Sequence, residues 1–355
     1  MINSKRLSVF SISAIAAFWL SIILLFLCIP SLVTLFYTEK SITVLTWPAF
    51  LDARYLQSFE KETGIKVHLR YVESNEELYV KLKETKGEGY DLIMPSDYMI
   101  EMLRNEDILK KVEMNKLPFA KEFYPHLLNN YYDPLNEYSI PYFWSMYGIA
   151  YNKDHFKNGE PVPSWALIFD EKVAPKHLCM IDGARELVQI AAQYLYGKQL
   201  TPLTQEQIAH IKAVLVKQKK IVELYTEDRA NFLLASNTSP LAVSIGAVAA
   251  RIMRNFNNIK FIIPQEGSFL NVDAFVIPKK TTKDDLIYTF LNYVYKEQVL
   301  KHHISKFGFF SPLKSVVITD SPVELPSTEQ IEKADFFKNI LSRAQLSDIW
   351  ISIKS

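Results

Sequence analysis

Side chains that could bind a small ligand occupy the ends of several expected strands in this 355-residue chain. Trp47 ends an alternating apolar segment, and Ser96 and Asp97 follow a second apolar segment. Open α/β sheets bind ligands at the carboxyl ends of their parallel strands, so we expect these side chains at one rim of a sheet. Asp273 lies inside a third apolar segment, 272–277, where an unpaired charge is costly to bury. The pattern predicts a binding site with acidic and aromatic groups.

Ordinary structural roles are the alternative for these residues. Trp47 could be a core residue, and Ser96 or Asp97 could cap the N-terminus of a helix. Catalysis has no support, because the sequence contains no Gly-x-Ser-x-Gly, Walker loop, His-Glu-x-x-His or Cys-x-x-Cys motif. His302 and His303 are neighbours on an expected helix and do not share a face, so we expect no metal site there. We therefore expect a binding protein that is not an enzyme and uses no cofactor or metal.

Charge and cysteine content exclude further classes of protein. The 40 Lys and Arg residues nearly balance the 39 Asp and Glu residues, and the net charge is +1. Such a chain has no overall positive field, so nucleic acid is not an expected partner. Of the two cysteines, Cys28 lies in the apolar N-terminal segment and Cys179 in the remainder of the chain. No disulfide is therefore expected within the soluble part, and Cys179 is expected in the core.

The N-terminal segment 7–38 contains no charged residue, and two basic residues precede it. The positive-inside rule keeps such an N-terminus in the cytoplasm and sends the following chain across the membrane. Residues 1–40 are therefore expected to form a signal peptide or a membrane anchor, and the length of the apolar run favours an uncleaved anchor. Cys28 could carry a lipid, but large apolar residues precede it where lipoprotein signals usually have a small one. We expect a periplasmic domain tethered to the inner membrane.

Hydrophobic periodicity predicts an α/β protein that opens with a βαβ unit. About 315 residues follow the N-terminal segment, which is more than one core usually organises and indicates two lobes. Strands are expected at 42–47, 66–72, 90–94, 176–181, 241–244, 259–263 and 272–277, with an extended apolar segment at 146–151. Helices are expected at 52–62, 74–85, 184–196, 204–218, 283–296 and 297–305. Ser74 and Glu77 fit a capping box. We expect the region 138–151 to lead into the second lobe and the strand 272–277 to return to the first.

Several short motifs follow one another along the chain. They are Thr63-Gly64-Ile65-Lys66-Val67, Glu73-Ser74-Asn75-Glu76, Tyr90-Asp91-Leu92 with Pro95-Ser96, Tyr138-Ser139-Ile140-Pro141-Tyr142, Asp182 with Ala184-Arg185-Glu186, and Pro264 with Glu266-Gly267 and Asp273. In this order the chain resembles the bacterial periplasmic spermidine/putrescine-binding proteins, the receptors of ATP-driven polyamine importers. The resemblance implies a two-lobed, type II periplasmic-binding-protein fold with two crossover segments. It places the first lobe at 41–146 and 272–317, and the second lobe at 147–271 and 318–355.

A polyamine is a chain of ammonium groups joined by methylenes, so its site needs carboxylates for the charges and aromatic faces for the stems. The resemblance implies ligand-binding roles for Trp47, Ser96, Tyr98, Glu186 and Asp273. Phe50, Asn271 and Phe309 occupy further pocket positions, where the family has Tyr, Trp and Tyr. Asp97 is an additional acid, whereas Ala49, Gly183 and Ser244 replace two acids and a second tryptophan. The acids that remain predict a cationic ligand in a site that is wider and more polar than the family's.

The departures from the family pattern leave alternatives open. The ligand could be a different cationic small molecule, and the chain could be a membrane-anchored sensor that reports on polyamines and delivers no cargo. An enzyme on the same scaffold would need a nucleophile beside a base, and the sequence supplies no such pair. The favoured expectation is a monomeric extracytoplasmic receptor that closes two lobes on a polyamine and presents it to an ABC transporter permease.

Overall fold

The computed structural model describes residues 14, 17–23, 40–48, 50–157, 159–197, 202–226 and 229–355. Within these ranges, residues 17–23 are helical, and no helix combines the length and the apolar character that a membrane crossing requires. Most of the expected signal peptide or anchor lies outside the described residues, as do Cys28 and Ala49. The expectations for those positions stay predictions.

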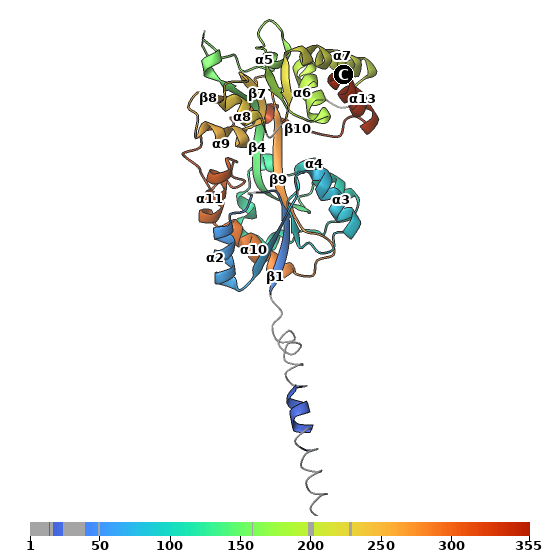
Figure 1. Ribbon diagram of the computed structural model, residues 1–355, viewed down its shortest axis with the longest axis vertical. Helices are drawn as coiled ribbons and strands as arrows, with labels where there is room; N and C mark the ends of the chain where they lie inside the picture. Colours follow the sequence, from blue (N-terminus) through green and yellow to red (C-terminus); the bar gives the residue numbers. More distant parts are fainter. Residues whose placement is uncertain are drawn as a thin grey trace, which may run out of the picture.

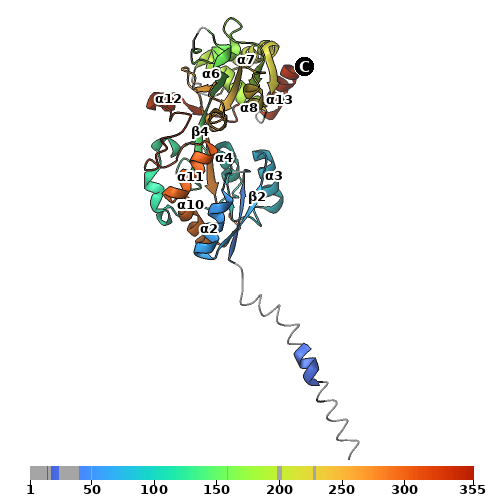
Figure 2. The ribbon, with the colours of Figure 1, turned by 60° about the vertical axis from the view of Figure 1, so that its left-hand side comes forward.

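Two α/β halves lie end to end and are joined by long strands (Figures 1 and 2). The strands are β1 (Ser41–Thr46), β2 (Lys66–Tyr71), β3 (Leu92–Ile93), β4 (Ser139–Asn152), β5 (Leu178–Met180), β6 (Val222–Tyr225), β7 (Leu241–Ile245), β8 (Ile259–Ile262), β9 (Phe269–Val276) and β10 (Asp335–Phe336). The α-helices are α2 (Ala53–Thr63), α3 (Asn75–Thr85), α4 (Asp97–Asn105), α5 (Ala166–Phe169), α6 (Ala184–Tyr196), α7 (Gln205–Gln218), α8 (Ala230–Ala235), α9 (Gly246–Met253), α10 (Asp284–Val294), α11 (Glu297–Phe307), α12 (Thr328–Lys333) and α13 (Arg343–Lys354). We call β1 to β3 with α2 to α4, α10 and α11 the first lobe, and β5 to β8 with α5 to α9 and α13 the second lobe.

The first lobe contains the predicted βαβ unit. β1 lies between β2 and β3 and pairs with both in parallel. The helix α2 begins after Asp52, whose Oδ1 accepts the backbone N–H of Arg54 at 2.9 Å. It ends at Gly64, which has a left-handed φ of 70° that glycine adopts without steric cost. Because β1 and β3 are parallel, their carboxyl ends lie at the same edge of the sheet, as predicted.

Two local predictions in this lobe are corrected by the structure. Ser74 caps α3 as expected, but the carboxylate of Glu77 accepts the N–H of Glu73, so the reciprocal half of the capping box is missing. The strand predicted at 90–94 is reduced to the two residues of β3. Met94 still donates its N–H to the carbonyl of Leu45 at 2.9 Å, and Pro95 after it has no N–H to continue the ladder.

β4 and β9 form the connection between the lobes (Figure 1). The sequence predicted an extended segment at 146–151 only, but β4 is a single strand of 14 residues that begins at Ser139. Its first half pairs antiparallel with β9, and its second half pairs with β7 and β8. The register shifts between Pro141 and Phe143, where the proline cannot donate to the ladder. The strand order β2-β1-β3-β9-β4-β7-β5-β6 therefore runs continuously from one lobe to the other.

Several elements of the second lobe and the C-terminal region were not predicted. The helix α6 has the predicted bounds, and α7 begins after Thr204, which forms a complete capping box with Gln207. The omitted elements are β6, β10, α5, α8, α9, α12 and α13. The apolar signal is weak for two of them, since β6 has no fully buried residue and α13 buries only Ile349 and Ile353.

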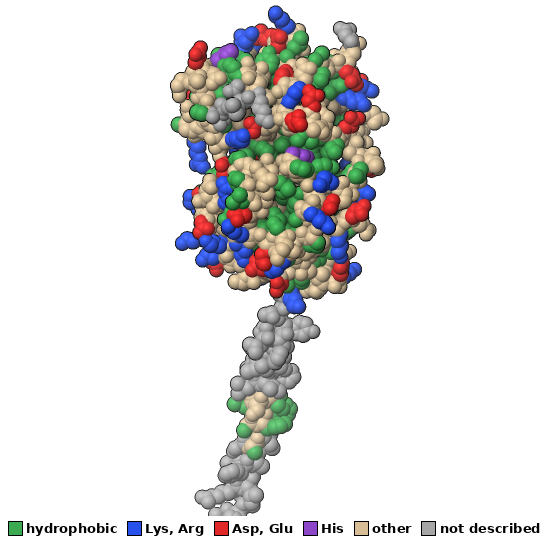
Figure 3. Space-filling model, turned by 180° about the vertical axis from the view of Figure 1, so that it is seen from behind, with side chains coloured by type: hydrophobic (Ala, Val, Ile, Leu, Met, Phe, Trp, Pro, Cys, Tyr) green, Lys and Arg blue, Asp and Glu red, His purple; other side chains and the backbone are tan. Residues whose placement is uncertain are grey.

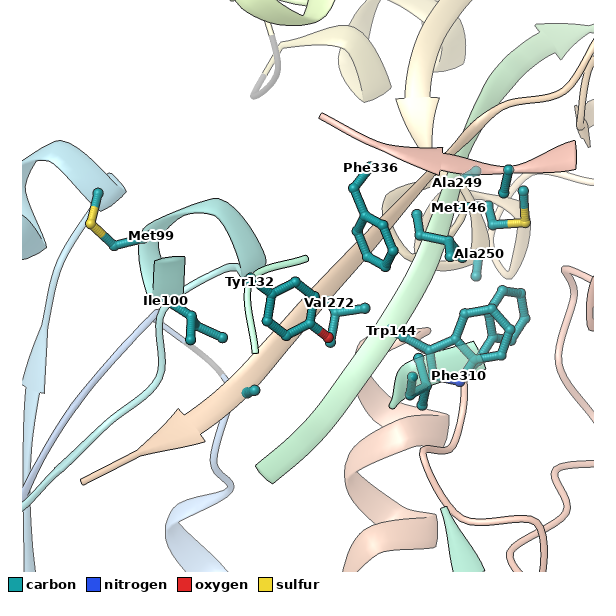
Figure 4. Packing of buried hydrophobic residues seen from close by; sticks show 14 of the residues in the cluster. Met99, Ile100, Tyr132, Trp144, Met146, Ala249, Ala250, Val272, Phe310 and Phe336 are labelled. Carbon is teal, nitrogen blue, oxygen red and sulfur yellow. The ribbon is translucent and has the colours of Figure 1, made fainter. Parts of the chain in front are cut away.

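The core continues from one lobe into the other along β4 and β9 (Figure 4). Trp144 of β4 is fully buried against Phe310 and donates its indole N–H to the carbonyl of Ser311 at 2.7 Å. Val272 of β9 belongs to the same cluster. Cys179 is fully buried, in agreement with the prediction. On the outer surface, acidic and basic side chains are interspersed (Figure 3), which fits the net charge of +1.

Candidate functional site

A cavity of about 1220 Å³ lies between the two lobes. All of the site residues predicted from the sequence line this cavity: Trp47, Phe50, Ser96, Asp97, Tyr98, Glu186, Asn271, Asp273 and Phe309. They come from the first lobe, from the second lobe and from β9, so the fold gathers residues that lie far apart in the sequence. Ser244 does not line the cavity, whereas its neighbour Ile245 does.

The sheet topology explains why the first-lobe residues meet. Trp47 follows β1, and Ser96 lies three residues beyond β3, at the same edge of the sheet. Asp273 belongs to β9, which pairs antiparallel with β3, and it forms an isolated bridge with Ser96. Ser96 precedes α4, but its hydroxyl makes no capping hydrogen bond. Ser96 therefore occupies the N-cap position that the alternative predicted, but its hydroxyl donates to Oδ1 of Asp273 at 2.8 Å and not to the helix.

Asp273 is a buried carboxyl group without a cationic partner. Asp273 is 3% exposed, and among the described residues no Lys, Arg or His forms an ion pair with its carboxylate. Its pKa is raised to about 7: burial is the main cause and the nearby Asp97 adds to it, while the Ser96 hydroxyl and the Trp47 indole act in the opposite direction. The indole N–H of Trp47 is buried and does not reach hydrogen-bond geometry with any described group. The site therefore holds an unneutralised acid beside an unsatisfied donor.

Asp97 is the second buried acid of the cavity and is also 3% exposed. It lies at the first position of α4, where its Oδ1 accepts the N–H of Tyr98 at 2.6 Å. Its Oδ2 accepts the N–H of Val272 at 3.1 Å, which ties α4 to β9. Burial raises its pKa to about 7 against the lowering effect of these N–H groups and of Arg185. Asp97 therefore combines a structural role with a position on the cavity wall.

An aromatic wall adjoins the two acids. The ring centroid of Phe50 lies 5.2 Å from that of Phe309, 5.3 Å from that of Phe143 and 6.4 Å from that of Trp47. Phe143 and Phe309 stack at 4.7 Å. These spacings are typical of favourable aromatic pairs, so the rings support one another and hold Trp47 beside Asp273. The wall provides the apolar surface that an alkyl stem requires.

Glu186 lines the cavity from the second lobe, but it already has a partner within the protein. Arg185 donates from Nε to Oε1 of Glu186 at 2.8 Å, and Nη2 contacts the same oxygen. The guanidinium carbon of Arg185 lies 3.7 Å from the centroid of the Tyr98 ring, across the cleft. Sequence reasoning missed Arg185 as a site residue, because neighbouring helical residues do not normally face each other. Its presence in the Ala184-Arg185-Glu186 motif was the only signal.

A ligand-sized cavity between two α/β lobes, lined from both sides and from the connecting strand, defines a two-lobed solute receptor. The chain belongs to the family of bacterial extracellular solute-binding proteins, whose model matches residues 54–330. This assignment confirms the predicted fold class.

Individual relatives narrow the class further. The chain is 31% identical over 315 residues to a spermidine/putrescine-binding periplasmic protein of Haemophilus influenzae, covering 85% of this chain and 83% of that protein. It is 28% identical over 341 residues to a putrescine-binding periplasmic protein of Pseudomonas aeruginosa, covering 89% and 92% of the two chains. The crystal structure of a spermidine/putrescine ABC transporter substrate-binding protein from Streptococcus pneumoniae superimposes with a TM-score of 0.79 at 25% identity, covering 89% of this chain and 98% of that chain. The predicted resemblance is therefore confirmed, and these relatives are periplasmic or transporter-associated binding proteins.

Proposed function

We propose that this protein is an extracytoplasmic receptor that binds a polyamine between its two lobes and delivers it to an ABC importer. The relatives named for spermidine and putrescine support the ligand class, and the cavity supports the place of binding. The observation that carries the proposal is Asp273, a buried carboxyl group on a strand that connects the lobes, with no cation of the protein paired to it among the described residues.

An ammonium group is the natural partner for such a carboxylate. Its positive charge would favour the ionised form of Asp273 and Asp97 and would offset the repulsion between these two acids. It would also donate charge-assisted hydrogen bonds to their carboxylates. The methylene stem would lie against the wall formed by Trp47, Phe50 and Phe309. Micromolar binding requires about 8 kcal/mol, which is within reach of two neutralised charges and this aromatic contact.

Lobe closure follows from the same arrangement. A ligand that contacts Asp273 on the connecting strand and also the facing surface of the second lobe favours the closed state over the open one. We place the first lobe at 41–146 and 272–317 and the second at 147–271 and 318–355. We further propose a monomer without enzymatic activity, located in the periplasm and tethered to the inner membrane by residues 1–40.

A thermal-shift panel tests the proposed function. The full chain is heated with putrescine, spermidine, spermine, thiamine, lysine and arginine, each at several concentrations. A ligand at 100 times its dissociation constant stabilises the folded state by about 2.7 kcal/mol, so an amine ligand should raise Tm measurably. A shift with an amine that disappears in Asp273→Asn supports the proposal. The absence of a shift with every polyamine contradicts it.

A further inference from the structure

The cavity is larger than a plain polyamine requires. Pockets of roughly 300–1000 Å³ bury most of a drug-sized ligand, and a polyamine is a narrow, unbranched chain. The cavity measures about 1220 Å³ although the two lobes already touch beside it. The guanidinium carbon of Arg185 lies 3.7 Å from the Tyr98 ring centroid, and the Tyr131 hydroxyl donates to the carbonyl oxygen of Phe337 at 3.2 Å. The excess volume is therefore not only the gap between separated lobes.

The helix α3 forms one wall of the excess space. Asn75, Glu76, Tyr79 and Val80 line the cavity, and because 75 and 79, like 76 and 80, are four residues apart, they share one face of the helix. Val80 is 51% exposed, so it offers apolar surface to a ligand. At the rise of an α-helix, about 7 to 8 Å of this wall separates Asn75 from Val80. The wall is polar at its inner end and apolar further out.

The helix α13 and the segment before it form the opposite wall. Leu341 and Leu346 line the cavity from there. The pKa of Lys83 on α3 is raised mainly by its hydrogen bond with Tyr79, and the charge of Arg343 on α13 opposes this rise. The two helices are therefore near enough for their charges to interact, and they lie on the same side of the molecule (Figure 1). A space with apolar side chains on both walls favours an uncharged, apolar part of a ligand.

Asn75 adds a hydrogen-bond donor at the inner end of this space. The residue is 8% exposed, and its Oδ1 accepts the backbone N–H of Ser96 at 3.2 Å, which fixes the orientation of the side-chain amide. Its Nδ2 has no hydrogen-bond partner in the part of the chain that the structure describes. Ammonium groups only donate hydrogen bonds, so they cannot satisfy this N–H group. A carbonyl oxygen on the ligand can.

The acidic groups of the cavity still require a charged ligand. Asp97 and Asp273 form no ion pair with a Lys, Arg or His side chain among the described residues. Glu76 shares the cavity-facing side of α3 and accepts the Tyr98 hydroxyl at 3.1 Å. A ligand that fits all of these groups combines ammonium groups with one acceptor oxygen and one apolar part.

We propose that the space between α3 and α13 is a second subsite that takes an amide-linked apolar group, and that the protein therefore binds N-acylated polyamines. The inference rests on the proposed function and specifies its ligand. One ammonium group of the ligand lies at Asp273, and the amide oxygen accepts the Nδ2 N–H of Asn75. The acyl chain then lies against Val80 of α3 and against Leu341 and Leu346 of the opposite wall.

Isothermal titration calorimetry on the full chain at pH 8 tests the inference. The probes are spermidine and its N-acetyl, N-butanoyl and N-hexanoyl derivatives, all acylated on the same terminal nitrogen. The three derivatives carry equal charge and differ only in apolar length. In the wild type each added methylene should tighten binding by up to about threefold, so the N-hexanoyl derivative should bind at least about tenfold more tightly than the N-acetyl derivative.

Asn75→Asp tests the proposed contact with the amide oxygen. The variant keeps an oxygen that accepts the N–H of Ser96 and loses the side-chain N–H donor. Its affinity for the N-hexanoyl derivative relative to spermidine should fall by about tenfold. A ratio that stays within about twofold of the wild-type ratio overturns the inference.

Val80→Asn and Val216→Asn are a matched pair. Both valines are exposed on helices, but Val216 belongs to α7 and lies away from the cavity. Val80→Asn should reduce the gain from N-acetyl to N-hexanoyl by about threefold or more, whereas Val216→Asn should leave it within about twofold. The pair also decides the matter if Asn75→Asp does not fold, as judged by far-UV circular dichroism.

The outcomes separate this inference from the proposed function. Equal binding of the three acyl derivatives by the wild type, or an unchanged gain in Val80→Asn, overturns the inference, while binding of spermidine leaves the proposed function standing. Failure of the wild type to bind any amine, acylated or not, overturns both.

Discussion

Replacing Asp273 by Asn should stabilise the ligand-free protein at pH 8 and abolish its response to amines. Burial raises the pKa of this carboxyl from 3.8 to about 7. A group with a raised pKa contributes stability that is complete below about pH 4 and is lost as the pH rises through 7. The rise corresponds to about 4 kcal/mol lost at pH 8. Asn carries no charge and can still accept the Ser96 hydroxyl, but its new N–H donors lack partners, so the expected net gain is about 2 kcal/mol.

Urea unfolding of the wild type and of Asp273→Asn at pH 8 and pH 4 measures this effect. The free energy of unfolding should rise by about 2 kcal/mol at pH 8 and fall by about 2 kcal/mol at pH 4, where the native carboxyl is already protonated and only the cost of the unpaired N–H donors remains. Asp107→Asn is the control, because this side chain is 79% exposed and the change should stay within about 0.5 kcal/mol at both pH values. Destabilisation of Asp273→Asn at pH 8, or a putrescine-induced rise in Tm that survives the substitution, would refute the reasoning.

Three further predictions follow from the same geometry. Asp97 and Asp273 must be charged to hold an ammonium group, and burial raises the pKa of each to about 7. The affinity for an amine should therefore fall by about tenfold or more from pH 8 to pH 5.5, and calorimetry that finds equal affinities at the two pH values contradicts this. Ser96→Ala should weaken amine binding by about three- to tenfold but lower the free energy of unfolding by less than about 1 kcal/mol, because the Ser96 hydroxyl donates to Asp273 and does not cap α4. A loss of stability without a loss of affinity would contradict this role. Gly267→Ala should cost about 3 kcal/mol in urea unfolding, because φ is +103° and the new Cβ would lie 2.5 Å from a backbone carbonyl oxygen; a cost below about 1 kcal/mol would contradict it.

Most of the elements that position the site were predictable from the sequence because local signals specify them. The helix α2 is bounded by a capping Asp52 and by Gly64, and both act in the structure as their residue types predict. The length of β4 was not predictable, since Pro141 interrupts the strand pattern and only pairing with β9 carries the strand through it. Elements with few buried residues, such as α13, gave too weak an apolar pattern to be predicted.

The site was predictable as a set of residues but not as a set of contacts. Family motifs and strand ends identified the residues that line the cavity, because motif order and sheet topology together fix their positions. Which side chains pair depends on their rotamers and on the residues of the facing lobe, and neither can be read from the local sequence. For this reason Glu186 was expected to be available to the ligand, whereas the structure pairs it with Arg185. Likewise, the sequence offered a helix cap as the alternative role for Ser96, and the hydroxyl is directed to Asp273.

The most direct test of the central claim is a crystal structure of the protein with putrescine bound. We predict that one ammonium nitrogen lies within about 3 Å of a carboxylate oxygen of Asp273, with the stem against Trp47 and both lobes in contact with the ligand. A diamine bound outside the cavity, or bound within it with no nitrogen near Asp273, would contradict the account.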